Sequence, residues 1–299
     1  MSKVIVVVGP TSSGKSSLGV ELAKKYNGEI INGDAISVYK ELNIGSAKIT
    51  EEEMQGVKHH LIDYLDVKEE YNVAQFQQSA RAAIEDIISQ EKLPIVVGGT
   101  GLYVKALLYD YDFSNPTERN DEQYEEYKNE QLYEMLVKMD EKAAEKVHPN
   151  NRRRVIRALQ ICNTGTKKSE IEDAQMHQPI YDCLIIGLNT DREVINQRIN
   201  NRVDQMVEQG LENEVKDLFE KYPYTYHCFQ GIGYKEFIDY VENRTTLSET
   251  IEAIKLHTRQ FAKRQMTWFK NQMDVTWFDI ADEDYKQQIE QKVEDFING

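Results

Sequence analysis

The stretch that decides the fold runs from Val4 to Ser16 and reads Val4-Ile5-Val6-Val7-Val8-Gly9-Pro10-Thr11-Ser12-Ser13-Gly14-Lys15-Ser16. Its first five residues form a continuous β-branched run, typical of a strand buried on both faces of a parallel sheet. The next eight match the complete phosphate-loop pattern, in which backbone N–H groups and a helix N-terminus bind an anion. In such a loop Lys15 reaches the outer phosphates and the Ser16 hydroxyl ligates Mg²⁺. The stretch therefore predicts a strand, a phosphate-binding loop and a helix, the last over residues 16–26.

Strand and helix signals keep alternating beyond this loop. Residues 29–32 and 95–97 predict two short strands, and residues 73–92 predict a helix between them. This alternation predicts an α/β fold, a P-loop NTPase-like core with a mostly parallel sheet flanked by helices. A strand is expected again only at residues 183–188, and the remaining chain is expected to be mostly helical, with a last long helix from about residue 248 to 271.

The middle of the chain has a different character. Residues 114–119 combine Asn, Pro and charge and predict a linker, and residues 121–147 carry a highly charged helical pattern. His148-Pro149-Asn150 ends that pattern, and Asn150 or Asn151 is placed to cap a helix that runs to about Cys162. We therefore expect a first part of the catalytic core over residues 1–112, an all-helical insertion domain over 113–180, and the rest of the core with C-terminal helices over 181–299.

Composition excludes several classes of protein. The 299 residues are 40% hydrophobic and 29% charged, which predicts a folded globular chain, and no run approaches the roughly 18 apolar residues of a membrane helix. Three widely spaced cysteines fit neither a zinc site nor a disulfide framework, so a cytoplasmic protein is expected. The net charge of −15 argues against nonspecific binding to nucleic acids or membranes but allows a local basic surface.

Two positions at strand ends are candidates for catalysis. Asp34 follows the strand at residues 29–32, where small phosphate-loop kinases place a general base, although an Asp here could also be a structural helix cap. Neither residues 95–98 nor 184–187 end in the metal-positioning Asp that motor and switch NTPases carry. Thr100 stands among three glycines after another strand, where the backbone can approach a ligand and a single hydroxyl is exposed.

Basic residues gather at three places despite the acidic total. On a helical wheel Arg153, Arg154 and Arg157 lie opposite an apolar face. Because no acidic residue is interleaved with them, contact with phosphates is favoured over a plain solvated face. Arg202, one turn after Arg198, is placed to clamp a diphosphate. In the last long helix Lys263 and Arg264 precede Trp268 and Phe269, and we expect these two aromatic residues to be core anchors. The pair His59-His60 is interpreted as structural because it has no metal-ligand partners.

These residues belong to a larger set of motifs that occur in order. Besides the phosphate loop, Asp34 and Val97-Gly98-Gly99-Thr100, the set includes Ile44-Gly45-Ser46-Ala47-Lys48, His59-His60-Leu61-Ile62-Asp63, His148-Pro149-Asn150, Gly231-Ile232-Gly233-Tyr234-Lys235-Glu236 and the run from Arg259 to Phe269. From about residue 3 to 270 the chain closely resembles the tRNA isopentenyltransferase family. The family commonly has Ser where Ala35 stands and, in many members, Gln where Ser37 stands.

The resemblance implies transfer of a dimethylallyl group from dimethylallyl diphosphate to N6 of the adenine just 3′ of the tRNA anticodon (position 37). It implies Asp34 as acceptor of the N6 proton, Thr100 at the leaving oxygen, and diphosphate held with Mg²⁺ by Gly9, Pro10, Thr11, Ser12, Ser13, Gly14, Lys15, Ser16 and Arg202. Contacts with the anticodon stem-loop fall to Asp34, Ala35, Ile36, Ser37, Thr100, Arg153, Arg154, Arg157, Lys263 and Arg264. A monomer that binds no membrane is expected.

Two other functions remain open on the residues alone. A small-molecule or nucleoside kinase would use ATP at the phosphate loop and Asp34 as base, with the insertion as a lid. A nonenzymatic RNA-binding module would not need Lys15, Asp34 and Thr100 together, because binding alone requires no aligned acid.

Overall fold

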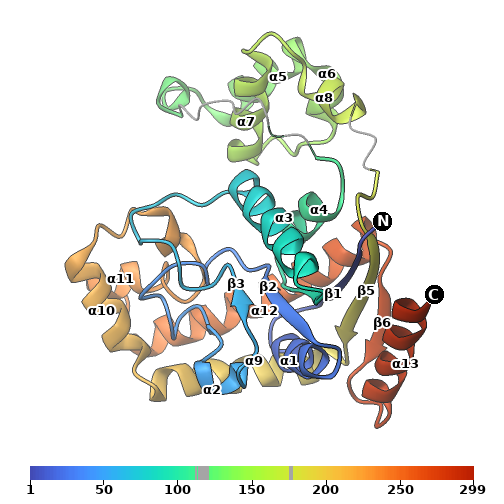
Figure 1. Cartoon of the computed structure of the whole chain (residues 1–299). Helices are drawn as coiled ribbons and strands as arrows, with labels where there is room; N and C mark the ends of the chain where they lie inside the picture. Colours follow the sequence, from blue (N-terminus) through green and yellow to red (C-terminus); the bar gives the residue numbers. More distant parts are fainter. Residues whose placement is uncertain (112, 114–120, 175–177) are drawn as a thin grey trace. The chain divides into compact units, whose positions relative to one another are not determined.

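The computed structural model describes residues 1–111, 113, 121–174 and 178–299 (Figure 1). The chain forms two compact units, one built from Met1–Leu108 and Ile180–Gly299, the other from Tyr109–Pro179. The linker expected at residues 114–119 lies outside the described residues. No helix in the described part of the chain is both long and apolar enough to cross a membrane.

The first unit is organised around a six-stranded sheet in the order β3-β2-β4-β1-β5-β6, and every strand pair in it is parallel. The strands are β1 (Lys3–Val8), β2 (Gly28–Asn32), β3 (His59–His60), β4 (Leu93–Val97), β5 (Asp182–Asn189) and β6 (Thr276–Asp279). The apolar run that opens the chain forms β1, which lies between β4 and β5 and has no exposed residue from Val4 to Val8. The predicted α/β fold is confirmed.

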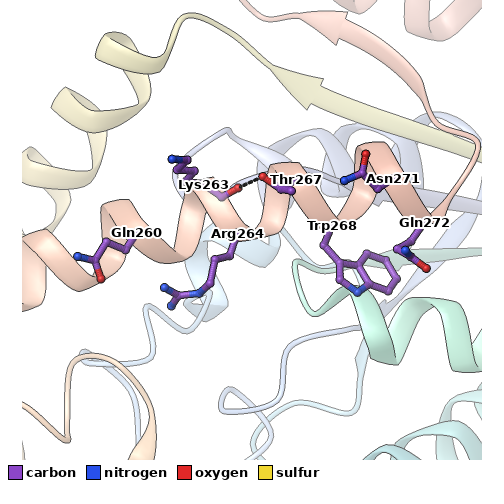
Figure 2. A pocket seen from close by; sticks show the side chains of 7 residues that line it. All are labelled: Gln260, Lys263, Arg264, Thr267, Trp268, Asn271 and Gln272. Carbon is purple, nitrogen blue, oxygen red and sulfur yellow. Dashed lines mark hydrogen bonds between the residues drawn. The ribbon is translucent and has the colours of Figure 1, made fainter. Parts of the chain in front are cut away.

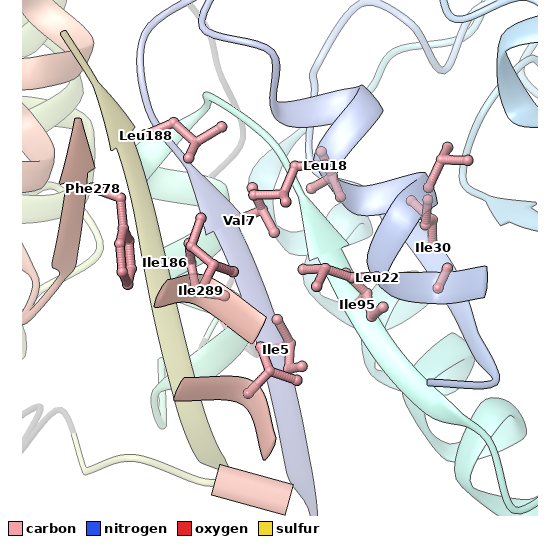
Figure 3. Close-up of a cluster of buried hydrophobic side chains, with 14 residues drawn as sticks. Ile5, Val7, Leu18, Leu22, Ile30, Ile95, Ile186, Leu188, Phe278 and Ile289 are labelled. Carbon is pink, nitrogen blue, oxygen red and sulfur yellow. The ribbon is translucent and has the colours of Figure 1, made fainter. Parts of the chain in front are cut away.

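Helices cover both faces of this sheet. The helices of this unit are α1 (Lys15–Lys25), α2 (Glu51–Met54), α3 (Val73–Ser89), α4 (Gly101–Leu108), α9 (Arg192–Glu208), α10 (Leu211–Lys221), α11 (Phe237–Val241), α12 (Leu247–Gln272) and α13 (Tyr285–Asn298), and part of this set lies on the sheet. On one face, alternate strand residues such as Ile5, Ile95 and Ile186 pack against Leu22 of α1 and Ile289 of α13 (Figure 3). On the other face α3 contacts β2 and β4 and packs along α4.

The second unit is helical in its described residues. It contains α5 (Asn129–Met139), α6 (Glu141–Glu145), α7 (Arg152–Cys162), α8 (Lys168–Ala174) and a 3₁₀ turn at Glu122–Tyr124. Leu132 and Leu136 of α5 meet Val155 and Leu159 of α7 in its core. The prediction of one helical stretch over residues 121–147 is wrong in detail, because Asp140 ends α5 and caps α6 by accepting a hydrogen bond from Ala143 N–H at 3.1 Å. Asn151 caps α7, as one of the two alternatives predicted.

Two elements of the first unit depart from the sequence prediction. The helix expected to reach residue 92 ends at Ser89, because Glu91 takes a left-handed conformation with φ of 57° that turns the chain into β4. The strand β6, which pairs with β5, was not predicted, although Thr276, Trp277 and Phe278 are residue types that favour strands. His59 and His60 form the short edge strand β3, and His60 Nε2 lies 2.6 Å from the Glu29 carboxylate.

Candidate active site

The phosphate loop follows β1 with a backbone that few residues could adopt. Gly9 has φ of 142°, and a Cβ there would lie 2.5 Å from the carbonyl oxygen of Leu188. Gly14 has φ of 91° at the start of α1, and Ser12 has φ of 63° although it is not glycine. The hydroxyls of Ser12 and Ser13 are buried, and neither has a hydrogen-bond partner among the residues that the structure describes. Strained backbone and unpaired buried hydroxyls concentrate at ligand sites, so this loop has the properties of an anion-binding site.

Two cations and one carboxylate share the space at this loop. The Lys15 ammonium donates to the Pro10 carbonyl at 2.6 Å. Burial, followed by repulsion from Arg202, lowers the pKa of Lys15 to about 7, and the Asp34 carboxylate opposes that shift. Arg202, on α9, donates to the Ala47 carbonyl at 3.2 Å, and burial also lowers its pKa. The structure thus brings together Lys15, Arg202 and Asp34, which the sequence separates by up to 187 positions (202 − 15).

Asp34 lies just beyond β2 and closes a tight turn with its own side chain. Its Oδ1 accepts from the backbone N–H of Ile36 at 2.8 Å and of Ser37 at 3.1 Å, and the Ser37 hydroxyl lies 3.4 Å away. Ser37 is buried, whereas Ala35 and Ile36 are half-buried beside the carboxylate. These bonds fix the orientation of the carboxylate and leave Oδ2 without a hydrogen bond in the described part of the chain. Asp34 starts no helix, since the next helix begins at Glu51, so the helix-cap alternative is wrong. One carboxylate oxygen closes the turn, and the other remains available to a substrate.

Thr100 lies in the loop between β4 and α4, in direct contact with the Asp34 segment. Gly33 N–H donates to the Val97 carbonyl at 2.8 Å. A Cβ on Gly98 would lie 2.6 Å from the Gly33 carbonyl oxygen, so these two backbones touch. Thr100 is half-buried and directly precedes α4. Its carbonyl accepts hydrogen bonds from the N–H groups of Tyr103 and Val104 in the first turn of that helix. The ends of β1, β2 and β4 therefore place the phosphate loop, Asp34 and Thr100 at one edge of the sheet, where α/β proteins bind ligands.

Two side chains that support these loops were not found from the sequence. Gln265 of α12 is buried and bonds Thr11 N–H at 2.9 Å and the Gly99 carbonyl at 3.0 Å. The Glu214 carboxylate of α10 accepts from the N–H groups of Asn43, Ile44 and Gly45 and from the Tyr234 hydroxyl, at 2.8–3.1 Å. The segment that Glu214 holds continues to Ala47, the partner of Arg202. The only sequence signal for either contact was the presence of Gln265, Gly99, Gly45 and Tyr234 within motifs.

The basic residues of α12 line an open pocket of about 510 Å³. Figure 2 shows Lys263 and Arg264, both exposed, with the half-buried indole of Trp268 on the following turn. Gln260, Thr267, Asn271 and Gln272 complete the lining. The prediction of two core anchors is confirmed for Phe269, which is fully buried, and is wrong for Trp268, because that ring lies across Gly101 and faces the pocket.

In the second unit, the arginines of α7 divide into two kinds. Arg153 and Arg154 are exposed, opposite the buried Val155 and Leu159, as the helical wheel predicts. Arg157 is half-buried and lies 3.5 Å from the Gln160 carboxamide. Arg152, in contrast, donates to the carbonyls of Tyr124 and Tyr127 at 2.5 and 2.6 Å and is a structural residue.

An anion-binding loop after the first strand, with an acid and a hydroxyl at neighbouring strand ends, defines the P-loop class of proteins, which bind the phosphates of their substrates at this edge. Within that class the chain belongs to the IPP transferase family, whose model matches residues 37–272.

Individual relatives match over nearly the whole chain. A tRNA dimethylallyltransferase of Anoxybacillus flavithermus is 47% identical over 99% of this chain and 96% of its own. The solved tRNA isopentenylpyrophosphate transferase of Bacillus halodurans is 42% identical with a TM-score of 0.77, and the alignment covers 100% of this chain and 97% of that one. A solved eukaryotic dimethylallyltransferase acting on tRNA is 36% identical with a TM-score of 0.88, over 100% and 80% of the two chains. None of these relatives favours the kinase alternative.

Proposed function

We propose that this chain transfers a dimethylallyl group from dimethylallyl diphosphate to N6 of the adenine at position 37 of tRNA, releasing diphosphate. The family membership supports the reaction, since relatives over the full length are named tRNA dimethylallyltransferase. The observation that carries the assignment of residues is the meeting of the phosphate loop, Asp34 and Thr100 at one sheet edge. A donor held there by its diphosphate lies beside both a base and a hydroxyl.

The phosphate loop binds the diphosphate of the donor. The cradle formed by residues 9–16 recognises phosphate oxygens rather than the group attached to them, so a prenyl diphosphate can take the place of a nucleotide. Lys15 and Arg202 flank it, and a bound diphosphate would draw Lys15 away from the Pro10 carbonyl that it contacts. As the C–O bond breaks, negative charge builds on the leaving diphosphate, and these fixed cations stabilise it.

Asp34 acts on the attacking amine of the tRNA, and Thr100 acts on the leaving diphosphate. The amine N6 attacks the allylic carbon, the new C–N bond forms as the C–O bond breaks, and diphosphate leaves with the electron pair. Asp34 accepts the proton that N6 loses, and its fixed turn also orients the amine. The Thr100 hydroxyl donates a hydrogen bond to the leaving oxygen.

The residues present suit Mg²⁺ as the metal. Mg²⁺ prefers oxygen ligands and keeps several waters together with substrate phosphates. The Ser16 hydroxyl is exposed at the first turn of α1 and makes no hydrogen bond within the described residues, so it is available as a ligand. Those residues contain no cluster of three His, Cys, Asp or Glu side chains, which fits a metal held mainly by phosphates and water. When bound, Mg²⁺ supplies charge neutralisation for the diphosphate.

Binding of tRNA falls to basic side chains of α7 and α12 and to the turn beside Asp34. Arg153, Arg154 and Arg157 on α7 and Lys263 and Arg264 on α12 contact the backbone of the anticodon stem-loop. The adenine leaves its stack and enters the site beside Ala35, Ile36 and Ser37, where its N6 can react. Unstacking costs a few kcal/mol in a loop that is already single-stranded. We also propose that the protein acts as a monomer and that the reaction takes place in the cytoplasm.

One assay separates this function from the kinase alternative. The protein is incubated with unmodified tRNA, Mg²⁺ and either labelled dimethylallyl diphosphate or γ-labelled ATP. We expect label to enter tRNA from the prenyl donor alone. Transfer of the γ-phosphate of ATP to a metabolite, without prenylation, would replace the proposal by the kinase.

A further inference from the structure

Gln265 connects the two loops on which the proposed reaction depends. It lies on α12 with 6% of its surface exposed, and both ends of its carboxamide are used. The oxygen Oε1 accepts from the backbone N–H of Thr11, in the phosphate loop, at 2.9 Å. The nitrogen Nε2 donates to the carbonyl of Gly99, the residue before Thr100, at 3.0 Å. A single planar amide therefore spans the two loops.

The space around this amide is closed. A Cβ on Gly99 would lie 2.2 Å from Nε2 of Gln265, so only glycine allows this approach. Trp268 lies one helical turn after Gln265 on α12, and a Cβ on Gly101 would lie 2.1 Å from its ring. The helix α12 thus packs closely against the Thr100 loop on both sides of Thr100, and the two hydrogen bonds hold the buried carboxamide in this orientation.

We propose that Gln265 is a positioning residue that sets the distance between the phosphate loop and Thr100. The inference rests on the proposed function, in which the diphosphate held by the first loop must present its leaving oxygen to the hydroxyl on the second. Gln265 contacts neither reacting group. Because its two partners are backbone groups, it fixes the loops themselves rather than one side chain on them.

This role separates binding from chemistry. Inorganic diphosphate needs only the phosphate loop, Lys15 and Arg202, which remain when Gln265 is lost. The transfer step needs both loops in register, and a displacement of about 1 Å in a reacting geometry costs on the order of 10²-fold in rate. An apolar side chain at position 265 also removes the bridge between the Thr11 N–H and the Gly99 carbonyl, so the two loops can shift relative to each other while each keeps its own fold.

The first test is Gln265→Leu, with Gln77→Leu as its matched control. Gln77 is equally buried, at 8% exposure, and donates to the Ala106 carbonyl within α4, away from both loops. We measure the single-turnover rate at saturating dimethylallyl diphosphate and tRNA, the Kd of inorganic diphosphate, and Tm. For Gln265→Leu we expect a rate about 100-fold lower with a Kd changed less than about threefold, and for the control an unchanged rate.

The second test is Gln265→Glu, which uses pH to restore the bridge. As a carboxylate the new side chain accepts from Thr11 N–H but cannot donate to Gly99, whereas the protonated acid can do both. Burial raises the pKa of such a carboxyl, so protonation is accessible at mildly acid pH. The rate of the variant divided by that of the unaltered protein should rise as pH falls, a ratio that cancels titrations common to both. If Gln265→Leu fails to fold, this second variant still tests the inference.

Each outcome decides the inference. A rate for Gln265→Leu within threefold of the unaltered protein overturns it, as does a loss of diphosphate affinity as large as the loss of rate. A rate ratio for Gln265→Glu that stays flat with pH, while Tm shows the variant folded, overturns it as well. If the unaltered protein itself transfers no dimethylallyl group, the proposed function falls and this inference with it, whereas an active protein with an unaffected variant removes the inference alone.

Discussion

The donor loops, residues 9–16, 33–37 and 98–101, and the arginine face of α7, Arg153, Arg154 and Arg157, are built on opposite principles. The donor loops are shaped by backbone: Gly9 cannot carry a Cβ, Gly98 touches Gly33, and Asp34 is held by its own turn. The arginine face consists of long side chains on a regular helix, two of them exposed. Geometry that is fixed this closely suits a bond-making step, and mobile surface charge suits recognition of a flexible polyanion. The two regions should therefore fail in different measurements.

The largest effect is expected from Asp34→Asn. The amide keeps an oxygen to accept from Ile36 and Ser37 N–H, so the turn survives, but it cannot take the N6 proton. The value of kcat should fall by about 10²–10⁴-fold, the usual contribution of a general base, while the Kd for tRNA stays unchanged. Asp191→Asn is the control, because Asp191 also accepts from a backbone N–H, that of Glu193, at the start of α9. A variant with near-full kcat would remove Asp34 from the chemistry.

A smaller loss is expected from Thr100→Val, which deletes the hydroxyl and keeps the shape. Removing one donor to a developing oxyanion costs on the order of 10²-fold in kcat. Thr258→Val is its control, since the Thr258 hydroxyl bonds the Ile254 carbonyl of its own helix at 2.7 Å. Rates are measured by single turnover with labelled donor. Equal rates in the two variants would show that Thr100 contributes packing alone.

The arginine face should change affinity and not rate. Replacing Arg153 and Arg154 together by Gln should weaken tRNA binding roughly tenfold near physiological salt and reduce the slope of log K against log salt by about 1.5, as expected for two lost phosphate contacts. Saturating kcat should be unaffected. Arg152→Gln on the same helix is the matched control, because Arg152 bonds the carbonyls of Tyr124 and Tyr127. It should lower Tm and leave the salt slope intact; a slope unchanged in the double variant would return this face to ordinary solvent exposure.

The same contrast explains how far the sequence alone could be interpreted. The boundaries of β1 and α1 were predicted within one residue, because glycines in the loop between them dictate the backbone locally. Gln265 and Glu214 could not be found, because their partners are backbone groups at separations such as 254 and 169 positions, and a backbone N–H leaves no mark in a sequence. Trp268 was misassigned for a related reason: its neighbour Phe269 is fully buried, and only the packing of α12 on Gly101 shows which ring faces the pocket.

The pH dependence of donor binding tests whether the donor loops are as closely shaped as proposed. Burial and Arg202 hold the pKa of free Lys15 near 7, and a bound diphosphate, as an anion, must raise it. Below pH 7 Lys15 is already protonated, so its contribution to affinity is complete. As pH rises above 7 the free protein loses this proton and binding must recover it, so affinity falls by at most about tenfold per pH unit until the pKa of the bound form is reached.

Lys15→Arg isolates this contribution, because a guanidinium stays charged across the range while the titration of the donor itself is the same in both proteins. The ratio of the Kd of dimethylallyl diphosphate for the unaltered protein to that for the variant should therefore rise between pH 7 and pH 9 and stay level below pH 7. Calorimetry at pH 8 in two buffers of different ionisation enthalpy should show proton uptake on binding to the unaltered protein beyond that of the variant. Parallel profiles would mean that the Lys15 ammonium is solvated in the free protein and does not lie folded against the Pro10 carbonyl, so the loop would be looser before binding than its geometry indicates.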